Sequence, residues 1–344
     1  MEPDSLEAWA SANLKSTFAV IGLGGAGSEA AQDLVELGIA GVETCVINTD
    51  AKSLDRVRAD RKVLIGQRHL KGGGSGGDRE AVLAAIEDGK ADLQARLEEF
   101  EIVFLVAGLG GGTGSALLPY LAGLMQKSRS LAIPIAFLPF HIELDSNPVR
   151  RANSLQALEE LEHLDGLLLA LSNEKLRRFE SLPLQRVFHV RNTYLHRLVS
   201  SLVDMVENPS QLNVDLASLK RHLRDSGLST LLYAEQHVSE PERLIHQALT
   251  ETLLDFDLDE AQAPSALIHI DGGSNMTLRT LDRVLHAVQH RLGRPQRLMF
   301  GTRTHPETRE VVRMTAVIGG LRRRTARQAL TTAPPPALPL PIVH

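Results

Sequence analysis

The chain has 344 residues, of which 43% are hydrophobic, and a formal net charge of −5 at pH 7. One cysteine excludes a disulfide-built scaffold, and no apolar run approaches the roughly 20 residues that a bilayer-spanning helix needs. The acidic balance gives no reason to expect a nucleic-acid partner. We therefore expect a cytoplasmic protein of two domains without direct membrane insertion.

The first half of the chain alternates apolar strand-like runs with segments of helical periodicity. The expected strands are 18–21, 42–47, 63–65, 102–106, 133–138 and 166–171, and the expected helices are 28–37, 78–99, 115–128 and 149–164. Strands that are apolar throughout are typical of a parallel sheet covered on both faces. The pattern predicts a doubly wound α/β domain.

A first glycine-rich loop, Gly22-Leu23-Gly24-Gly25-Ala26-Gly27, follows the first strand. Glycine lets backbone N–H groups approach phosphate oxygens, and the next helix adds its positive N-terminal end. Alone, this loop also fits a dinucleotide fingerprint, because Asp50 closes the second strand about twenty residues further on. A nicotinamide or flavin oxidoreductase is therefore one alternative.

A second glycine-rich loop, Gly108-Leu109-Gly110-Gly111-Gly112-Thr113-Gly114-Ser115, follows a later strand, so both loops should lie at one sheet edge. Two anion sites on one edge indicate a polyphosphate ligand, which disfavours the dinucleotide alternative. The loop lacks the lysine of a Walker motif. Backbone N–H groups, the hydroxyls of Thr113 and Ser115, and a divalent cation must then meet the charge.

The second half begins with a long helix, 184–206, whose apolar positions recur near a helical period. Strands are then expected at 229–234, 265–270, 297–302 and 311–318, with helices at 241–254 and 278–292. This pattern predicts a smaller α/β domain with a mixed sheet. The proline-rich run 331–341 predicts an extended tail.

Several further segments, in the same order, resemble the tubulin and FtsZ superfamily, and FtsZ in particular over roughly 17–321. The run Gly110 to Ser115 resembles the signature loop, and the other matching segments are Asn48-Thr49-Asp50-Ala51, Gly72 to Gly77, Pro139 to Glu143, Ser172 to Leu176, and Asn213-Val214-Asp215. The resemblance implies an N-terminal extension (1–16), a GTP-binding domain (17–183), a central helix (184–207), a C-terminal α/β activation domain (208–325) and a flexible tail (326–344).

The resemblance also implies that GTP or GDP is the ligand, with Mg²⁺ held mainly by the phosphates. Phe188 and Asn192, four residues apart on one helical face, stand where the family stacks a ring on guanine and hydrogen-bonds its edge. The implied nucleotide-binding residues are Gly24, Gly25, Ala26, Gly27, Glu29, Asn48, Asp50, Gly74, Ser75, Gly76, Gly108, Gly110, Gly111, Gly112, Thr113, Gly114, Ser115, Glu143, Arg150, Asn173, Phe188 and Asn192.

Asn213, Asp215 and Ser218 resemble the catalytic loop that completes the active site of the next subunit in a filament. Ser218 stands where the family has a second carboxylate, and a positioned carboxylate is typically worth about 10²–10⁴-fold in rate. We therefore expect slow hydrolysis, unless Asp215 alone suffices or Asp225 moves in. Helix N-capping is the alternative role of Asp215 and Ser218.

Two departures from the family concern the nucleotide. Glu29 stands where the family commonly has Asn, and its carboxylate either accepts hydrogen bonds from guanine N1 and N2 or is an exposed acid at a helix start. The loop after Glu143 is longer than expected, which leaves open whether Arg150 or Arg151 reaches the nucleotide.

Two functions follow from this pattern. The first is an FtsZ-like GTPase that forms nucleotide-dependent head-to-tail filaments, and the second is a non-hydrolysing nucleotide-binding protein that modulates a partner filament. The partners implied are further copies of the chain, and another FtsZ-like protein or an adaptor reached through the tail, although a merely solvated tail is equally compatible.

Overall fold

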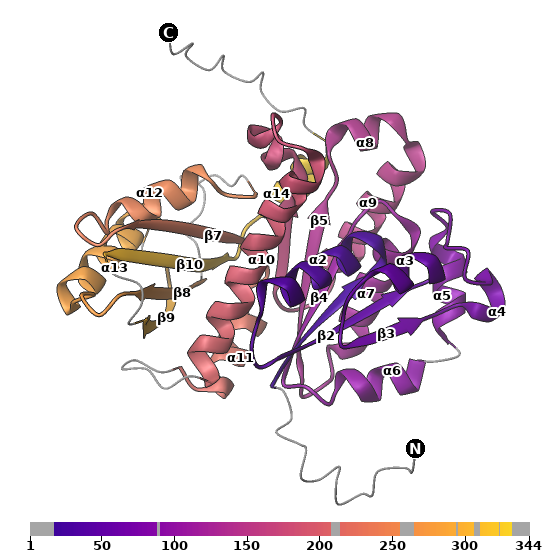
Figure 1. Ribbon diagram of the computed structural model, residues 1–344, viewed down its shortest axis with the longest axis horizontal. Coiled ribbons are helices and arrows are strands. Elements are labelled where there is room, and N and C mark those ends of the chain that lie inside the picture. The colour runs from indigo at the N-terminus through magenta and orange to yellow at the C-terminus, as the bar shows by residue number, and fades with distance from the viewer. Residues whose placement is uncertain are drawn as a thin grey trace, which may run out of the picture.

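The computed structural model describes residues 17–87, 90–207, 214–254, 265–293, 295–305, 310–322 and 324–331. Within these residues ten strands form one sheet in the order β3-β2-β1-β4-β5-β6-β7-β10-β8-β9 (Figure 1). The strands are β1 (Phe18–Leu23), β2 (Val42–Asn48), β3 (Arg61–Leu64), β4 (Ile102–Gly108), β5 (Leu131–Leu138), β6 (Leu168–Ser172), β7 (Leu228–His237), β8 (Ser265–Gly272), β9 (Arg297–Thr304) and β10 (Val311–Gly319).

Helices connect most of these strands. They are α2 (Gly24–Leu37), α3 (Ala51–Arg56), α4 (Gln67–Leu70), α5 (Arg79–Glu87), α6 (Lys90–Leu97), α7 (Gly112–Met125), α8 (His141–Ser146), α9 (Pro148–Glu162), the 3-10 helix η1 (Asn173–Phe179), α10 (Leu184–Glu207), α11 (Leu216–Arg224), α12 (Arg243–Thr250), α13 (Leu278–Arg291) and α14 (Arg324–Thr331).

The strands β1 to β6 are parallel, as the alternating pattern predicts. Gly22 of β1 pairs with Val46 of β2 on one side and with Val106 of β4 on the other. These three strands therefore end at nearly the same level. The glycine-rich loops that follow β1 and β4 lie at one edge of the sheet, which confirms the expected arrangement.

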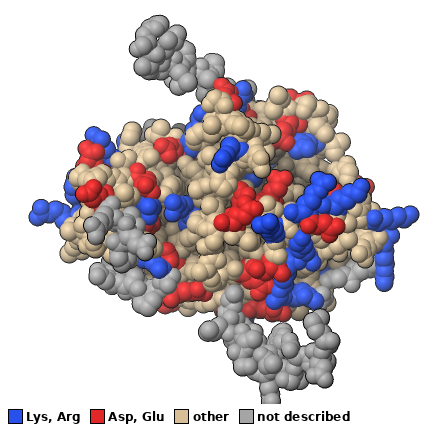
Figure 2. Space-filling view, in the orientation of Figure 1, with Lys and Arg blue, Asp and Glu red and all other residues tan. Residues whose placement is uncertain are grey.

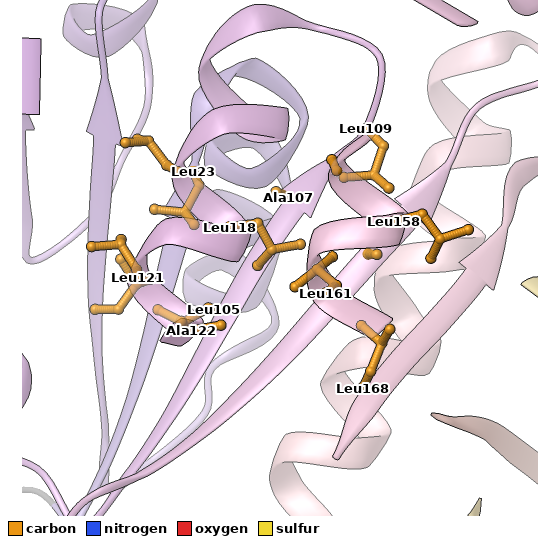
Figure 3. Close-up of a cluster of buried hydrophobic side chains, with 14 of the residues drawn as sticks. Leu23, Leu105, Ala107, Leu109, Leu118, Leu121, Ala122, Leu158, Leu161 and Leu168 are labelled. Carbon is orange, nitrogen blue, oxygen red and sulfur yellow. The ribbon is translucent and has the colours of Figure 1, made fainter. Parts of the chain in front are cut away.

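Helices cover both faces of this parallel part. The helices α5, α6, α7, α9 and α14 pack on one face, and α2, α10 and α11 pack on the other (Figure 1). Figure 3 shows leucines of α7 and α9, including Leu118 and Leu161, meeting Leu105 of β4. Each fully buried leucine stabilises the fold by about 1.5–3 kcal/mol, so this layer holds the loop-bearing strands rigidly.

The second half continues the same sheet. Its strands are mixed as predicted, because β10 is antiparallel to β7 and β8, whereas β9 is parallel to β8. The pairing of β6 with β7 joins the two halves through Leu168 with Leu228 and Leu169 with Ser229. The helices α12 and α13 cover one face, and α10 covers the other. The helix α10 thus packs against both halves.

Two expectations need correction. The predicted helix 78–99 is two helices, α5 and α6, and the sequence between them contains Gly89, a poor helix former. The predicted tail 326–344 begins within α14, where Ala326 and Leu330 are buried and Arg327 pairs with Glu162 at 2.9 Å. The rest of the tail, 332–344, and the extension 1–16 lie outside the described residues.

The surface mixes charges of both signs. Acidic and basic side chains are interspersed across the face in Figure 2. Among the described residues, no helix has the length and apolar character to cross a membrane.

Candidate functional site

A cavity of about 470 Å³ opens at the edge of the sheet where β1, β2 and β4 end. Of the residues predicted to bind the ligand, those that line it are Gly25, Ala26, Glu29, Asn48, Asp50, Gly74, Ser75, Gly76, Gly108, Gly111, Gly112, Thr113, Gly114, Glu143, Arg150, Asn173 and Phe188. Five predicted residues are not part of the lining: Gly24, Gly27, Gly110, Ser115 and Asn192.

The two glycine-rich loops touch each other. Gly24 has a φ of 67°, and a Cβ there would stand 3.0 Å from the backbone nitrogen of Gly114. The helices α2 and α7 begin at Gly24 and Gly112, so the unpaired N–H groups of two helix N-termini converge on the cavity. Such an arrangement favours a polyphosphate.

Thr113 joins three loops. Its Oγ1 lies 2.8 Å from Oγ1 of Thr49 and 3.4 Å from Oγ of Ser75. The third loop is further held by the Gly74 N–H, which donates to the Thr49 carbonyl at 3.3 Å. A Cβ on Gly112 would meet Ser75 Oγ at 2.3 Å. The loops after β2, β3 and β4 therefore form one packed wall.

Ser115, which the sequence analysis assigns to ligand binding, is not part of the cavity lining. It is fully buried, and its Oγ accepts a hydrogen bond from the Gly110 N–H at 2.8 Å. This bond closes the signature loop on itself. The hydroxyl is therefore committed to loop geometry, and Thr113 is the hydroxyl of this loop that faces the cavity.

The charged lining is not strongly cationic. It contains the cations Arg150 and Arg191 and the acids Glu29, Asp50 and Glu143. Arg150 Nη1 donates to Glu143 Oε2 at 2.6 Å. The pKa of Asp50 is lowered by hydrogen bonds, chiefly from the backbone N–H of Ser53. Side chains therefore cannot neutralise a triphosphate, and the backbone N–H groups must carry most of the binding.

Arg150, and not Arg151, lines the cavity. Arg151 pairs with Asp145 on the outer side of α8. The stem of Arg150 packs on Gly110, where a Cβ would approach its Cγ to 2.5 Å. Of the two arginines after the long loop, Arg150 is therefore the one that lines the cavity.

Aromatic rings mark the other end of the cavity. Phe137, Phe188 and Asn173 are part of the lining, and the Phe188 ring lies 6.1 Å from that of Phe140 behind it. Arg191, which the sequence analysis missed, contacts both Phe188 and Asn173. Arg191 is 2% exposed, and its guanidinium lies 3.8 Å from the centre of the Phe137 ring. Its position three residues after Phe188 was the available signal.

Asn192 does not reach the cavity in this structure. Its Oδ1 accepts hydrogen bonds from Arg191 Nε at 3.1 Å and from Arg191 Nη2 at 3.0 Å. Its Nδ2 donates to Asp33 Oδ2 at 2.8 Å. Both ends of the amide have a partner within the fold, and Asn192 thereby supports Arg191. The contact of Asn192 with a base stays a prediction.

The predicted catalytic segment lies at the far end of α10. Asp215 is exposed and is the N-cap of α11, where its Oδ1 accepts from the Ser218 N–H at 2.8 Å. Lys220 of α11 contacts Glu101 and Arg129, which precede β4 and β5. The cavity is at the opposite ends of these strands, and the 24 residues of α10 span about 36 Å.

The other residues of this segment are placed as follows. Asn213 lies outside the described residues. Asp225 pairs with Arg297, whose Nη1 lies 2.9 Å from the Asp225 carboxylate. Ser218 and Asp215 form the helix cap that was one of their two expected roles.

Two family models match the chain. The Tubulin/FtsZ family GTPase domain covers residues 17–181, and the FtsZ family C-terminal domain covers residues 234–322. The chain belongs to the Tubulin/FtsZ family of GTPases. The match spans both glycine-rich loops, so the dinucleotide oxidoreductase alternative is set aside.

Similarity to individual proteins supports the same family. The chain is 32% identical to the cell division protein FtsZ of Methanothermobacter thermautotrophicus over 90% of this chain and 81% of the relative. A solved FtsZ mutant of M. jannaschii matches with a TM-score of 0.79 and 32% identity over 92% of this chain and 94% of that one. CetZ2 from Haloferax volcanii, solved as a GTPgS-bound protofilament, shares the fold with a TM-score of 0.75 at 23% identity, over 91% and 98% of the two chains. The chain is a divergent FtsZ-like protein.

Proposed function

We propose that the protein binds GTP and assembles head to tail into filaments, with hydrolysis completed across each subunit junction. One observation carries the proposal: the phosphate-binding edge and Asp215 lie at opposite ends of one chain. The helix that Asp215 caps contacts the start of β4, and the cavity lies at the other end of that strand, whose seven residues span about 23 Å, so this carboxylate cannot act on a ligand within its own subunit. Stacking a second copy on the cavity brings the two together.

The nucleotide is held chiefly by main-chain groups. Its phosphates lie at the N-termini of α2 and α7, and its base lies beside Phe188. Mg²⁺ accompanies the phosphates, because the Asp50 carboxylate and the Thr113 hydroxyl supply hard oxygen donors in the same cavity. When bound, the ion neutralises phosphate charge that the side chains leave unbalanced.

The surface beside the cavity suits a subunit contact. Ile142 is 76% exposed and Leu184 is 61% exposed, and both border an apolar groove next to Phe140. Exposed apolar side chains clustered at one site are typical of an interaction surface. Two different surfaces that meet by translation produce an open filament instead of a closed dimer.

Hydrolysis is slow in this proposal. Asp215 polarises the attacking water, and its pKa is lowered by hydrogen bonds from Ser218, so the carboxylate is ionised near neutral pH. The hydroxyl of Ser218 cannot replace a second carboxylate as a base. Asp215 therefore acts without the acidic partner that the family pattern supplies.

The serine at position 218, where the family has a second carboxylate, also supports a second function, in which the nucleotide is bound and not hydrolysed. A chain that binds GTP or GDP without turnover can modulate the filament of a partner, either another FtsZ-like protein or an adaptor that reaches the tail. Tight nucleotide binding with no phosphate release at any protein concentration supports this alternative. The proposed process is cell division, because the relatives are named cell division proteins. The proposed compartment is the cytoplasm.

Electron microscopy of the purified protein tests the assembly. We expect filaments with GTP, and fewer or none with GDP or without nucleotide. Particles that stay monomeric in all three conditions, while GTP is bound, contradict the filament proposal and leave the regulatory alternative.

A further inference from the structure

Arg191 is a buried cation with an unusual environment. It is 2% exposed, and no ion pair joins it to a carboxylate of the described residues. Its only hydrogen-bond acceptors there are neutral amide oxygens, Asn192 Oδ1 and Asn173 Oδ1. A buried charge normally requires a carboxylate or an equivalent acceptor. The cavity that Arg191 lines is where such an acceptor can arrive.

Two N–H donors of Arg191 remain available for a ligand. A guanidinium has five N–H donors. Asn192 Oδ1 takes one from Nε and one from Nη2, and Asn173 Oδ1 takes one from Nη1 at 3.2 Å. One N–H therefore remains on each terminal nitrogen. The fork is fixed in place, because its face rests 3.8 Å from the centre of the Phe137 ring and 5.0 Å from that of Phe188.

We propose that Arg191 selects guanine by donating its two remaining N–H groups to O6 and N7 of the base, while Glu29 accepts from N1 and N2. The inference rests on the proposed binding of a guanine nucleotide. Glu29 lines the same cavity, and among the acids around Arg191 its charge has the largest effect on the pKa of that guanidinium. Arg191 thus pairs with the hydrogen-bond acceptors of guanine, and Glu29 pairs with its donors.

The arrangement rejects adenine for a physical reason. Adenine carries an amino donor where guanine carries O6, so a donor of Arg191 would face a donor of the base in a buried site. A bidentate arginine contact with guanine discriminates by about ten- to hundredfold. Asn192 and Asp33 are positioning residues here, because they hold the fork through Asn192 Oδ1 and Nδ2.

Nucleotide analogues test the proposal on the unmodified protein. The probes are GDP, ADP, inosine diphosphate, which lacks the 2-amino group, and 7-deazaguanosine diphosphate, which lacks only N7. We expect the 7-deaza analogue and ADP to bind on the order of ten- to hundredfold more weakly than GDP, because a buried N–H of Arg191 then has no acceptor. Equal binding of GDP and the 7-deaza analogue overturns the assignment of Arg191.

Substitutions at Arg191 then test whether this side chain is the partner of the altered group on the base. Arg191→Met keeps the length and loses the donors, and Arg191→Lys keeps the charge and loses the fork. In Arg191→Met, replacing N7 of the base by carbon should cost no further affinity, because N7 and the Arg191 donor belong to one contact. Arg151→Met is the matched control, since Arg151 pairs with Asp145 outside the cavity, and it should keep the selectivity of the wild type.

Inorganic tripolyphosphate separates base reading from phosphate binding. Its affinity should be equal in the wild type and in Arg191→Met. A variant that retains the wild-type preference for GDP over ADP overturns the inference and leaves nucleotide binding intact. If the variants fail to fold, the analogue series on the wild type decides alone. Failure of the wild type to bind tripolyphosphate and every nucleotide contradicts the proposed function itself.

Discussion

The two ends of α10 differ in how much of their chemistry one chain completes. At the Phe188 end, the loops after β1 to β5, two arginines and the rings of Phe137 and Phe188 already line a cavity of about 470 Å³. At the other end, Asp215 is an exposed carboxylate at the start of α11. The first end is a finished binding site, and the second is half of a reaction site.

This difference separates binding from turnover. Binding depends on loops that are fixed by contacts such as Thr49 with Thr113 at 2.8 Å, all within one subunit. Turnover depends on a group that must come from another copy. Changes at the two ends should therefore affect different measurements, and the following predictions use that separation.

The largest effect is expected from Ser218→Asp. The new carboxylate supplies the missing partner of Asp215 and should raise GTP turnover in the assembled state by about 10²–10⁴-fold, without changing GTP affinity. Phosphate release and nucleotide binding measured on the same preparation check both parts. Unchanged turnover removes the role assigned to position 218.

Asp215→Asn is the control for that substitution. Asparagine retains the ability to cap α11, because its side-chain oxygen can accept from the Ser218 N–H. We expect turnover to fall while thermal stability stays nearly constant. A variant that keeps its turnover identifies Asp215 as a helix cap alone.

A smaller effect is expected at the binding end from Gly112→Ala. The added Cβ would meet Ser75 Oγ at 2.3 Å and the Gly77 backbone carbon at 2.9 Å, so the loops must separate. Overpacking of this kind costs about 1–3 kcal/mol in the free energy of unfolding. Nucleotide affinity should fall as well.

Gly111→Ala is its matched neighbour, since a Cβ there meets no atom within 4 Å. Denaturant unfolding without nucleotide should show a loss for Gly112→Ala and almost none for Gly111→Ala. Equal losses in the two variants contradict the packed wall of loops.

The sequence predicts much of this fold because its signals are long and periodic. The expected strand 18–21 and helix 184–206 correspond to β1 and α10. Short helices such as α3 and α8 were missed, since six residues carry too little periodicity to detect. The continuous sheet was also missed, because the register of β6 with β7 is a tertiary feature.

The sequence likewise predicted one part of the site and missed another. The glycine-rich loops were found because glycine has a direct backbone role. Arg191 was missed because its importance depends on Phe137, which lies on another strand. Ser115 and Asn192 are not part of the cavity lining, and their side chains accept hydrogen bonds from Gly110 and Arg191, which the sequence alone does not reveal.

The smallest effect concerns the stability of the second half. His269 of β8 is 1% exposed, and burial, followed by the charges of His305 and Arg303, lowers its pKa to about 3. Between this pKa and the ordinary value of about 6.5, the unfolded chain binds a proton that the folded chain does not. The free energy of unfolding should therefore decrease as pH falls from about 7 to 5, by at most about 1.4 kcal/mol per pH unit for this group.

His269→Leu should reduce that pH dependence, and His286→Leu should not, since His286 is exposed on α13. Chemical denaturation at several pH values measures both. Identical pH dependence in the wild type and in His269→Leu rejects the contribution of this histidine. Nucleotide affinity should be unaffected, because His269 is not part of the cavity lining.

The rate of phosphate release per subunit, measured from dilute to concentrated protein with saturating GTP, tests the division of labour between the two ends of α10 most directly. A rate that starts near zero and rises with concentration is the predicted result, because each active site needs Asp215 from a neighbour. A constant, measurable rate per subunit at all concentrations would contradict it, since one chain would then hydrolyse GTP alone.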